Sequence, residues 1–150
     1  MSPTPTTKAA LNPALKPLPA LKTIIFLGLG FEAQNALPFF CDTYKDARII
    51  AADMNVAQFD AVQNFAASHD DFICVEQKDL PTILDEIEDA STTLIIRAAG
   101  IRLDVDVVTQ ADRHNIPHIT GLGFWLAYLA PTTTITITGS KGKSTTTAIT

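Results

Sequence analysis

The segment 139–145 contains the residues of this chain that are best suited to chemistry on a phosphate group. It reads GSKGKST and directly follows a Thr-rich run, residues 133–138, whose composition favours a strand. In such a turn the backbone N–H groups surround phosphate oxygens, Lys143 can reach the β- and γ-phosphates, and the Ser144 hydroxyl can ligate Mg²⁺. The spacing G-x-x-G-K-[ST] is shorter than the general P-loop form, because Ile137 stands where the first glycine is expected.

We therefore predict an ATP site with Mg²⁺ as its cofactor, in which Lys143 is the catalytic residue and Ser144 is the metal ligand. The alternative interpretation of this segment is an exposed tail rich in Ser, Thr and Lys. The predicted ATP phosphate-binding residues are Gly139, Ser140, Lys141, Gly142, Lys143, Ser144 and Thr145.

A second glycine-rich turn lies near the start of the chain. Residues 28–33 (GLGFEA) match G-x-G-x-x-[GA], follow an apolar run and precede a helical pattern, so free N–H groups at the helix start can face a phosphate. Asp53 ends the next apolar run, where an acid can accept hydrogen bonds from ribose hydroxyls. Glu32 is unfavourable beside a pyrophosphate unless its carboxylate turns away. A tight turn that binds nothing is the alternative.

Short apolar runs alternate with amphipathic stretches along the rest of the chain. The runs predict strands over 23–27, 48–52, 72–75, 93–96, 117–120 and 133–138. Helical spacing of apolar residues predicts helices over about 31–41, 56–67, 80–87, 104–114 and 122–129. This alternation requires crossover connections, and it predicts an α/β fold with a parallel, Rossmann-like sheet of about five strands flanked by helices. Ligands of such sheets bind at the carboxyl ends of the strands.

Composition excludes several classes of function. The hydrophobic share of 47% and the charged share of 18% are typical of a globular protein, and the net charge of −5 argues against a nucleic-acid partner. No apolar stretch is long enough for a membrane helix, and the Pro-rich residues 1–22 predict a flexible arm rather than a signal peptide. Cys41 and Cys74 are interpreted as two buried thiols of a cytoplasmic protein.

Several other residues are interpreted as structural. The histidines are expected at the surface or at loop edges, because their spacing does not suit a metal site. The acidic residues within 85–89 are expected on a solvated helix face. Trp125 and Tyr128 are expected in the core or in an interdomain patch rather than in a base-stacking platform. The histidines are His69, His114 and His118.

Together the two glycine-rich turns resemble the Mur ligase family of peptidoglycan-precursor enzymes. Residues 138–145 (TGSKGKST) resemble its T-G-[TS]-x-G-K-[ST]-[ST] ATP loop, and the Rossmann-like pattern before them resembles its UDP-substrate domain. The D-glutamate-adding members are most similar. Gly28 and Gly30 resemble their first-strand turn, Asp53 resembles the acid that contacts the UDP moiety, and residues 98–101 (AAGI) resemble their S-P-G-[IV] turn.

The likeness extends over residues 23–150, about the first third of such an enzyme, and it includes departures. Residues 116–121 and 124–129 resemble the strand and helix that lead into the ATP loop. Phe31, Glu32 and Ala33 replace the usual small or hydroxyl residues and glycine of the first turn. Ala98 and Ala99 replace Ser-Pro, and the charges of Arg97 and Arg102 flank that turn unexpectedly. These departures leave the exact UDP-sugar undetermined, and a variant ligase or paralogue is an open alternative.

The resemblance implies the N-terminal part of an ATP-dependent ligase that adds D-glutamate, or a related amino acid, to a UDP-N-acetylmuramoyl-L-alanine-type substrate through an acyl phosphate. It implies a UDP-substrate domain over 23–131 and the start of a central ATPase domain over 132–150. The chain ends about two turns into the expected ATP-loop helix, so we expect it to need central and C-terminal domains for activity. The predicted UDP-substrate-binding residues are Gly28, Gly30, Phe31, Glu32, Asp53, Met54, Asn55 and Gly100.

Two other functions remain open from the sequence. The main alternative is a module that binds NAD(P) or another dinucleotide, because the G-x-G-x-x-[GA] turn and Asp53 occur in such proteins as well. A regulatory or scaffold domain that keeps the fold and binds no nucleotide is the third. Thermal shifts with UDP-muramoyl ligands and with NAD distinguish the three.

Overall fold

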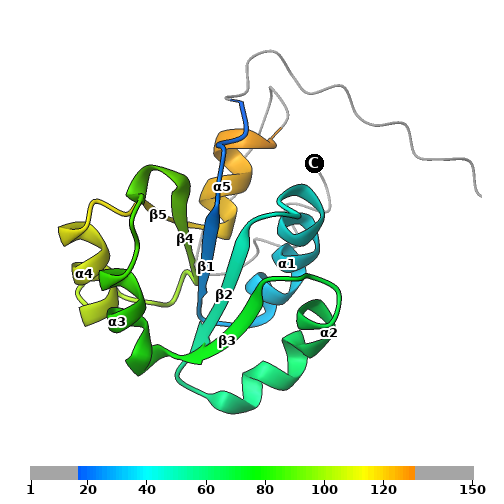
Figure 1. The fold of residues 1–150 in the computed structure, drawn as a ribbon, viewed down its shortest axis with the longest axis horizontal. Coiled ribbons are helices and arrows are strands. Elements are labelled where there is room, and N and C mark those ends of the chain that lie inside the picture. The colour runs from blue at the N-terminus through cyan, green and yellow to red at the C-terminus, as the bar shows by residue number, and fades with distance from the viewer. Residues whose placement is uncertain (1–16, 131–150) are drawn as a thin grey trace, which may run out of the picture.

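Five parallel strands form one sheet in the order β3-β2-β1-β4-β5 (Figure 1). The computed structural model describes residues 17–130, so residues 1–16 and the predicted ATP-loop segment lie outside the described residues. The α/β fold with a five-stranded parallel sheet flanked by helices is confirmed. The strands are β1 (Thr23–Leu27), β2 (Arg48–Asp53), β3 (Phe72–Glu76), β4 (Thr93–Arg97) and β5 (His118–Thr120).

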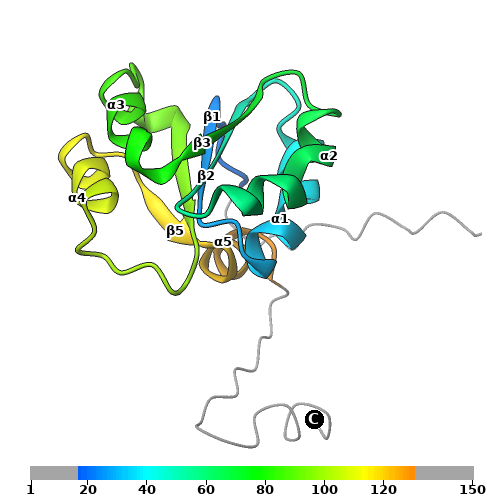
Figure 2. The same ribbon diagram turned by 90° about the horizontal axis from the view of Figure 1, so that it is seen from below.

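Helices cover both faces of the sheet. In Figure 2, α1, α2 and α5 lie on one side of the strands, and α3 and α4 lie on the other. The α-helices are α1 (Phe31–Thr43), α2 (Gln63–Ala66), α3 (Leu80–Asp85), α4 (Asp106–Arg113) and α5 (Gly121–Tyr128). Short 3-10 helices are η1 (Val56–Val62), η2 (Gln77–Asp79) and η3 (Ala90–Thr92).

The central strand β1 explains why the apolar runs are continuous. Ile24 and Phe26 point toward the α1 side and join one buried cluster, whereas Ile25 and Leu27 point toward the α3 side and join the other. All four side chains are fully buried. A strand covered on both faces needs apolar residues at every position, and its burial contributes about 1.5–3 kcal/mol for each such side chain.

Residues just before β1 also belong to the fold, although the sequence places them in a flexible arm. Leu18 and Leu21 pack against the buried cluster on the α1 side. The Lys22 N–H donates to the Thr92 carbonyl at 2.8 Å, and the Arg48 N–H donates to the Lys22 carbonyl at 2.8 Å. Residues 18–22 are therefore packed against the domain that the sequence predicts to begin at residue 23.

The helix predicted over residues 56–67 is not a regular α-helix in the structure. The segment 56–67 is a 3-10 helix followed by the single turn α2, and only Val62 of its apolar stripe is fully buried. Asn55 caps this segment, because its side-chain oxygen accepts the Ala57 N–H at 3.1 Å. Val56 stays exposed, so the apolar spacing reflects partial contact with the core rather than a complete amphipathic helix.

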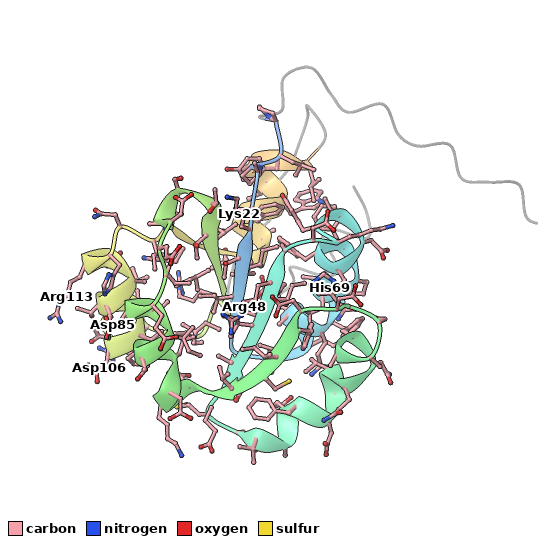
Figure 3. All side chains as sticks on the ribbon, viewed as in Figure 1. Lys22, Arg48, His69, Asp85, Asp106 and Arg113 are labelled. Carbon is pink, nitrogen blue, oxygen red and sulfur yellow. The ribbon has the colours of Figure 1, made fainter. Side chains whose placement is uncertain are left out.

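A buried histidine corrects one expectation from the sequence, and an exposed acid makes contacts that the sequence does not predict. His69 is 6% exposed and its Nε2 lies 2.7 Å from the Ala47 carbonyl, so it anchors a loop instead of facing solvent. The Asp85 carboxylate accepts hydrogen bonds from Gln110 at 2.7 Å and from His114 at 2.9 Å. Asp85, labelled in Figure 3, therefore links α3 to α4, while its side chain remains 61% exposed as expected for an acid on a solvated helix face.

The two cysteines are free thiols on the α1 side of the sheet. Cys41 and Cys74 are both half-buried rather than fully buried. Burial raises the pKa of each thiol above its ordinary value, so the reactive thiolate is disfavoured. Within residues 17–130, no helix combines the length and the apolar composition needed to cross a membrane.

Candidate functional site

The candidate site lies where the strand order reverses, at the carboxyl ends of β1 and β4. From β1 the chain continues to β2 on one side, and it later returns to β4 on the other side of β1. In open α/β sheets the loops after two such strands usually diverge and ligands bind at this reversal point, which we call the crevice. The predicted turn at residues 28–30 begins at this point, as the sequence analysis expects.

The two glycines of the first turn have different roles. Gly28 has a φ of +87°, and a Cβ there would lie 2.9 Å from the Ala98 Cβ and 3.0 Å from the Ile101 Cδ1. This glycine is required by backbone conformation and by the close approach of the loop after β4. Gly30 has ordinary dihedral angles, and a Cβ there would meet no atom within 4 Å. Its surface is open to a ligand.

Within residues 17–130, no side chain caps the N-terminus of α1. Gly30 precedes the helix, and its carbonyl accepts the first helical hydrogen bond from the Gln34 N–H at 3.1 Å. The N–H groups of the first turn have no partner within an α-helix, and together with the helix dipole they favour an anion. Phe31, the first residue of α1, is 84% exposed beside them. This end of the helix can hold a phosphate group.

Asp53 contacts the turn directly. Its Oδ2 accepts the Leu29 N–H at 2.7 Å, and its Oδ1 accepts the Asn55 N–H at 2.8 Å. The Leu29 amide is therefore already occupied by the protein and is not free for a phosphate. Each carboxylate oxygen keeps a second lone pair, which leaves Asp53 able to accept from a ribose hydroxyl while it holds the turn in place.

Glu32 points away from the uncapped end of α1. Its Oε1 accepts the Leu122 N–H at 3.0 Å, and the carboxylate lies against the Cα of Gly121, where a Cβ would be 2.8 Å from Oε1. The Thr120 hydroxyl oxygen accepts the Gly123 N–H at 3.0 Å. Two side-chain acceptors, Glu32 and Thr120, therefore cap the N-terminus of α5. Because the Glu32 carboxylate is held at α5, it is less unfavourable for a phosphate at α1 than the sequence suggests.

Arg97 holds the loop that follows β4. Its Nη1 donates to the Ile101 carbonyl at 2.7 Å, while its Nε is buried without a hydrogen-bond partner. The Ile101 N–H donates to the Ala98 carbonyl at 3.0 Å and closes the turn that contains the exposed Gly100. Arg102 is paired outside the crevice with an acid on the same loop. Arg97 thus orders the predicted turn.

A cavity of about 500 Å³ lies beside the end of β2. Met54 lines it together with Gln77 and Lys78, which follow β3, and with Pro81 and Asp106 at the starts of α3 and α4. Met54 is among the residues predicted from the sequence, whereas Gln77 and Lys78 are not. Both lie just after the predicted strand 72–75, so the residues that follow the carboxyl ends of the strands could have identified them.

The described structure therefore brings most of the predicted UDP-side residues to one edge of the sheet. Gly30, Phe31 and Asp53 surround the uncapped helix end, Gly28 and Glu32 serve packing and capping, and Asn55 supports Asp53 through its amide. The predicted ATP-binding residues 139–145, including the Mg²⁺ ligand, lie outside the described residues. Within residues 17–130, no group of three or more His, Cys, Asp or Glu side chains is placed to hold a metal ion.

Comparison with protein-family models and with curated proteins finds no match to this chain. The fold is consistent with a Rossmann-like domain, because the parallel order β3-β2-β1-β4-β5 carries helices on both faces. Many unrelated functions share this architecture, so function has to be argued from the crevice at its carboxyl edge.

Proposed function

We propose that this chain is the UDP-substrate-binding part, with the start of the ATP-binding part, of an ATP-dependent ligase that adds D-glutamate or a related amino acid to a UDP-N-acetylmuramoyl-type acid. The observation that carries the proposal is the uncapped N-terminus of α1 at the reversal point of the sheet. The sequence TGSKGKST at residues 138–145 supports it, since this pattern is suited to the phosphates of ATP.

The reaction requires two anionic substrates to meet. ATP transfers its γ-phosphoryl group to the substrate carboxylate, and ADP leaves. The amine of the incoming amino acid attacks the acyl carbon, loses a proton and displaces phosphate, so that an amide bond replaces the acyl phosphate. The enzyme contributes mainly by aligning the substrates and by stabilising negative charge, for which Lys143, Ser144 and Mg²⁺ are the proposed groups. We place this reaction in the cytoplasm, with residues outside this chain completing the catalytic site.

The UDP diphosphate is proposed to lie over Gly30 and Phe31. Their N–H groups belong to the open end of the helix, Gly30 has no side chain to obstruct a phosphate, and the Glu32 carboxylate binds the Leu122 N–H of α5 instead. Asp53 is proposed to accept from the uridine ribose with its remaining lone pairs.

The variant Gly30→Ala tests this placement. A Cβ at this position meets no protein atom within 4 Å, so the fold should be unaffected. It would stand between the backbone and the diphosphate, and we expect about a tenfold loss of UDP affinity with unchanged affinity for uridine. Isothermal titration with both ligands measures the difference, and equal losses for UDP and uridine would contradict the proposed position of the diphosphate.

A dinucleotide-binding module is the second candidate, because one observation favours it. The cavity of about 500 Å³ beside Met54 lies where Asp53 ends β2, close to the position that a bound dinucleotide gives its adenosine. Thermal-shift measurements with NAD, NADP, UDP and a UDP-N-acetylmuramoyl ligand separate the two candidates. Stabilisation by NAD or NADP, with none by the UDP ligands, would replace the ligase proposal with the dinucleotide one.

A further inference from the structure

Two buried side-chain nitrogen atoms have no hydrogen-bond partner within residues 17–130. They are the Nε of Arg97, at the end of β4, and the Nδ1 of His118, at the start of β5. Most buried polar atoms in proteins form at least one hydrogen bond, either to protein or to an internal water. Two unpaired nitrogens on neighbouring strands therefore need a common explanation.

The register of β4 and β5 places these two side chains on the same face of the sheet. His118 pairs with Ile95, which belongs to the buried cluster on the α3 and α4 side. Because alternate residues of a strand point to the same face, Arg97 points to that side as well. Diagonal neighbours on adjacent strands lie about 7–8 Å apart, a separation that a long side chain can span.

The other polar atoms of the two side chains show what each unpaired nitrogen can do. His118 Nε2 lies 3.1 Å from Oδ1 of Asp112 in α4, and a carboxylate accepts hydrogen bonds, so Nε2 carries the proton. The Nδ1 of the neutral ring is then an acceptor. Arg97 donates from Nη1 to the Ile101 carbonyl at 2.7 Å, and its Nε–H remains as a donor. The two unpaired atoms are therefore complementary.

We propose that Arg97, His118 and Asp112 form one polar chain beneath α4, in which the Arg97 Nε–H is joined to the His118 Nδ1 through one internal water. A single water has an acceptor lone pair for the Nε–H and a proton for the Nδ1, so it satisfies both atoms at once. The chain begins at the solvent-exposed Asp112, passes through His118, whose side chain is 20% exposed, and ends at the guanidinium.

The Asp112–His118 pair alone does not account for the arrangement. An ion pair with an exposed acid contributes little to stability, and it uses only one of the two ring nitrogens. An apolar side chain at position 118 would match its neighbour Ile95 without burying a second nitrogen. The histidine is explained when both ring nitrogens are used, one toward α4 and one toward Arg97.

The polar chain ends at the turn that packs on Gly28. Arg97 holds the Ile101 carbonyl, and the Ile101 Cδ1 lies 3.0 Å from the position of a Cβ at Gly28. His118 and Asp112 fix the direction of the guanidinium and so act on this turn as positioning residues. Their effect on UDP binding rests on the proposed function, because the turn carries the predicted UDP-side residue Gly100.

Nitrogen NMR of the full chain, labelled with ¹⁵N, tests the polar chain without any ligand. We expect the neutral ring of His118 to carry its proton on Nε2, with Nδ1 as a hydrogen-bonded acceptor. We also expect the Arg97 Nε–H to exchange slowly with solvent. A proton on Nδ1 in the neutral ring would overturn the proposal.

Two substitutions of His118 separate its two nitrogens. His118→Gln places an amide near the Nε2 position and keeps a donor for Asp112, but it removes the acceptor that faces Arg97. His118→Asn places an amide oxygen near the Nδ1 position and does the reverse. Exchange of the Arg97 Nε–H should become at least about fivefold faster in His118→Gln and should stay close to the wild-type rate in His118→Asn.

His114→Gln is the matched control. His114 binds Asp85 of α3, outside the proposed chain, so its substitution should leave the Arg97 signal unchanged. Equal exchange rates in His118→Gln and the wild type would overturn the link between His118 and Arg97. Equal acceleration in His118→Asn and His118→Gln would also overturn it, since a general loosening of α4 would explain both.

UDP titration of the same variants tests the positioning role. His118→Gln should lower UDP affinity about threefold, whereas His118→Asn should preserve it. Unchanged UDP affinity in His118→Gln, together with faster exchange at Arg97, would overturn the positioning role. Absence of UDP binding by the wild-type chain would overturn the proposed function, while the NMR result would still decide whether the polar chain exists.

Discussion

Two helices, α1 and α5, begin at the same edge of the sheet, and their N-termini are treated in opposite ways. The end of α1 has a glycine as its cap residue and no side chain that accepts from its amides. The end of α5 has Thr120 as its cap, and Glu32 accepts from the Leu122 N–H. Both helix dipoles favour an anion, but only the first is left without one.

The difference in capping between the two helix N-termini determines which of them remains available to an anionic ligand. Glu32 belongs to the first turn of α1, where its carboxylate could interact favourably with the dipole of that helix. It instead accepts the N–H of Leu122 in α5, which lies 90 residues later in the chain. One side chain therefore closes the second helix and leaves the first open. It also links α1 to α5.

The largest effect is expected when the turn before the open helix is disturbed. Gly28→Ala places a Cβ at a positive φ and within about 3 Å of Ala98 and Ile101, which should cost about 2–4 kcal/mol of folding stability. Urea unfolding measures the change. Gly30→Ala should stay within about 1 kcal/mol of the wild type, so equal losses for both glycines would contradict their different roles.

The variant Gly30→Asp gives the N-terminus of α1 a side-chain cap, as Thr120 and Glu32 do for the N-terminus of α5. Gly30 has the extended backbone of a cap residue, so an aspartate there can accept from the first-turn amides and should raise stability by a few tenths of a kcal/mol. Its charge should lower UDP affinity about thirtyfold or more. Gly30→Ser supplies a cap without the charge and should lower affinity less, whereas undiminished UDP binding in Gly30→Asp would place the phosphate elsewhere.

Local signals in the sequence predict the open terminus, and for a physical reason. The pattern G-x-G, the strand before it and the acid Asp53 lie within 31 residues of one another, and each follows from backbone geometry and apolar spacing. The parallel sheet follows from the alternation of strands and helices. These features depend on short stretches of chain, which the sequence displays directly.

Contacts between distant residues could not be predicted in this way. Nothing local to Glu32 indicates that it caps α5, and nothing local to Asp85 indicates that it binds His114. His69 is polar and follows a loop pattern, yet it is buried because one carbonyl, that of Ala47, lies within reach. The prediction of a regular helix over 56–67 failed for a related reason, since partial contact with the core does not produce a complete α-helix.

A smaller effect is expected at the closed terminus from its cap residue. Thr120→Ala removes the acceptor of the Gly123 N–H and should cost about 1 kcal/mol of folding stability, while Thr120→Ser should restore most of it. Thermal unfolding of the two variants gives the comparison. A loss in Thr120→Ser as large as in Thr120→Ala would show that the methyl group, not the hydroxyl, stabilises this end.

The smallest and most informative effect concerns Glu32 itself. Glu32→Gln keeps an oxygen for the Leu122 N–H and removes the charge, so stability should fall by only about 0.5 kcal/mol. The same change removes a negative charge from the first turn of α1, where the diphosphate is proposed to bind. UDP affinity should therefore rise about two- to threefold at low salt, and the gain should shrink at high salt because screening weakens a charge effect. A fall in UDP affinity would instead show that the Glu32 carboxylate contacts the ligand. The α1 end would then not be the sole binding end, and Glu32 would do more than cap α5.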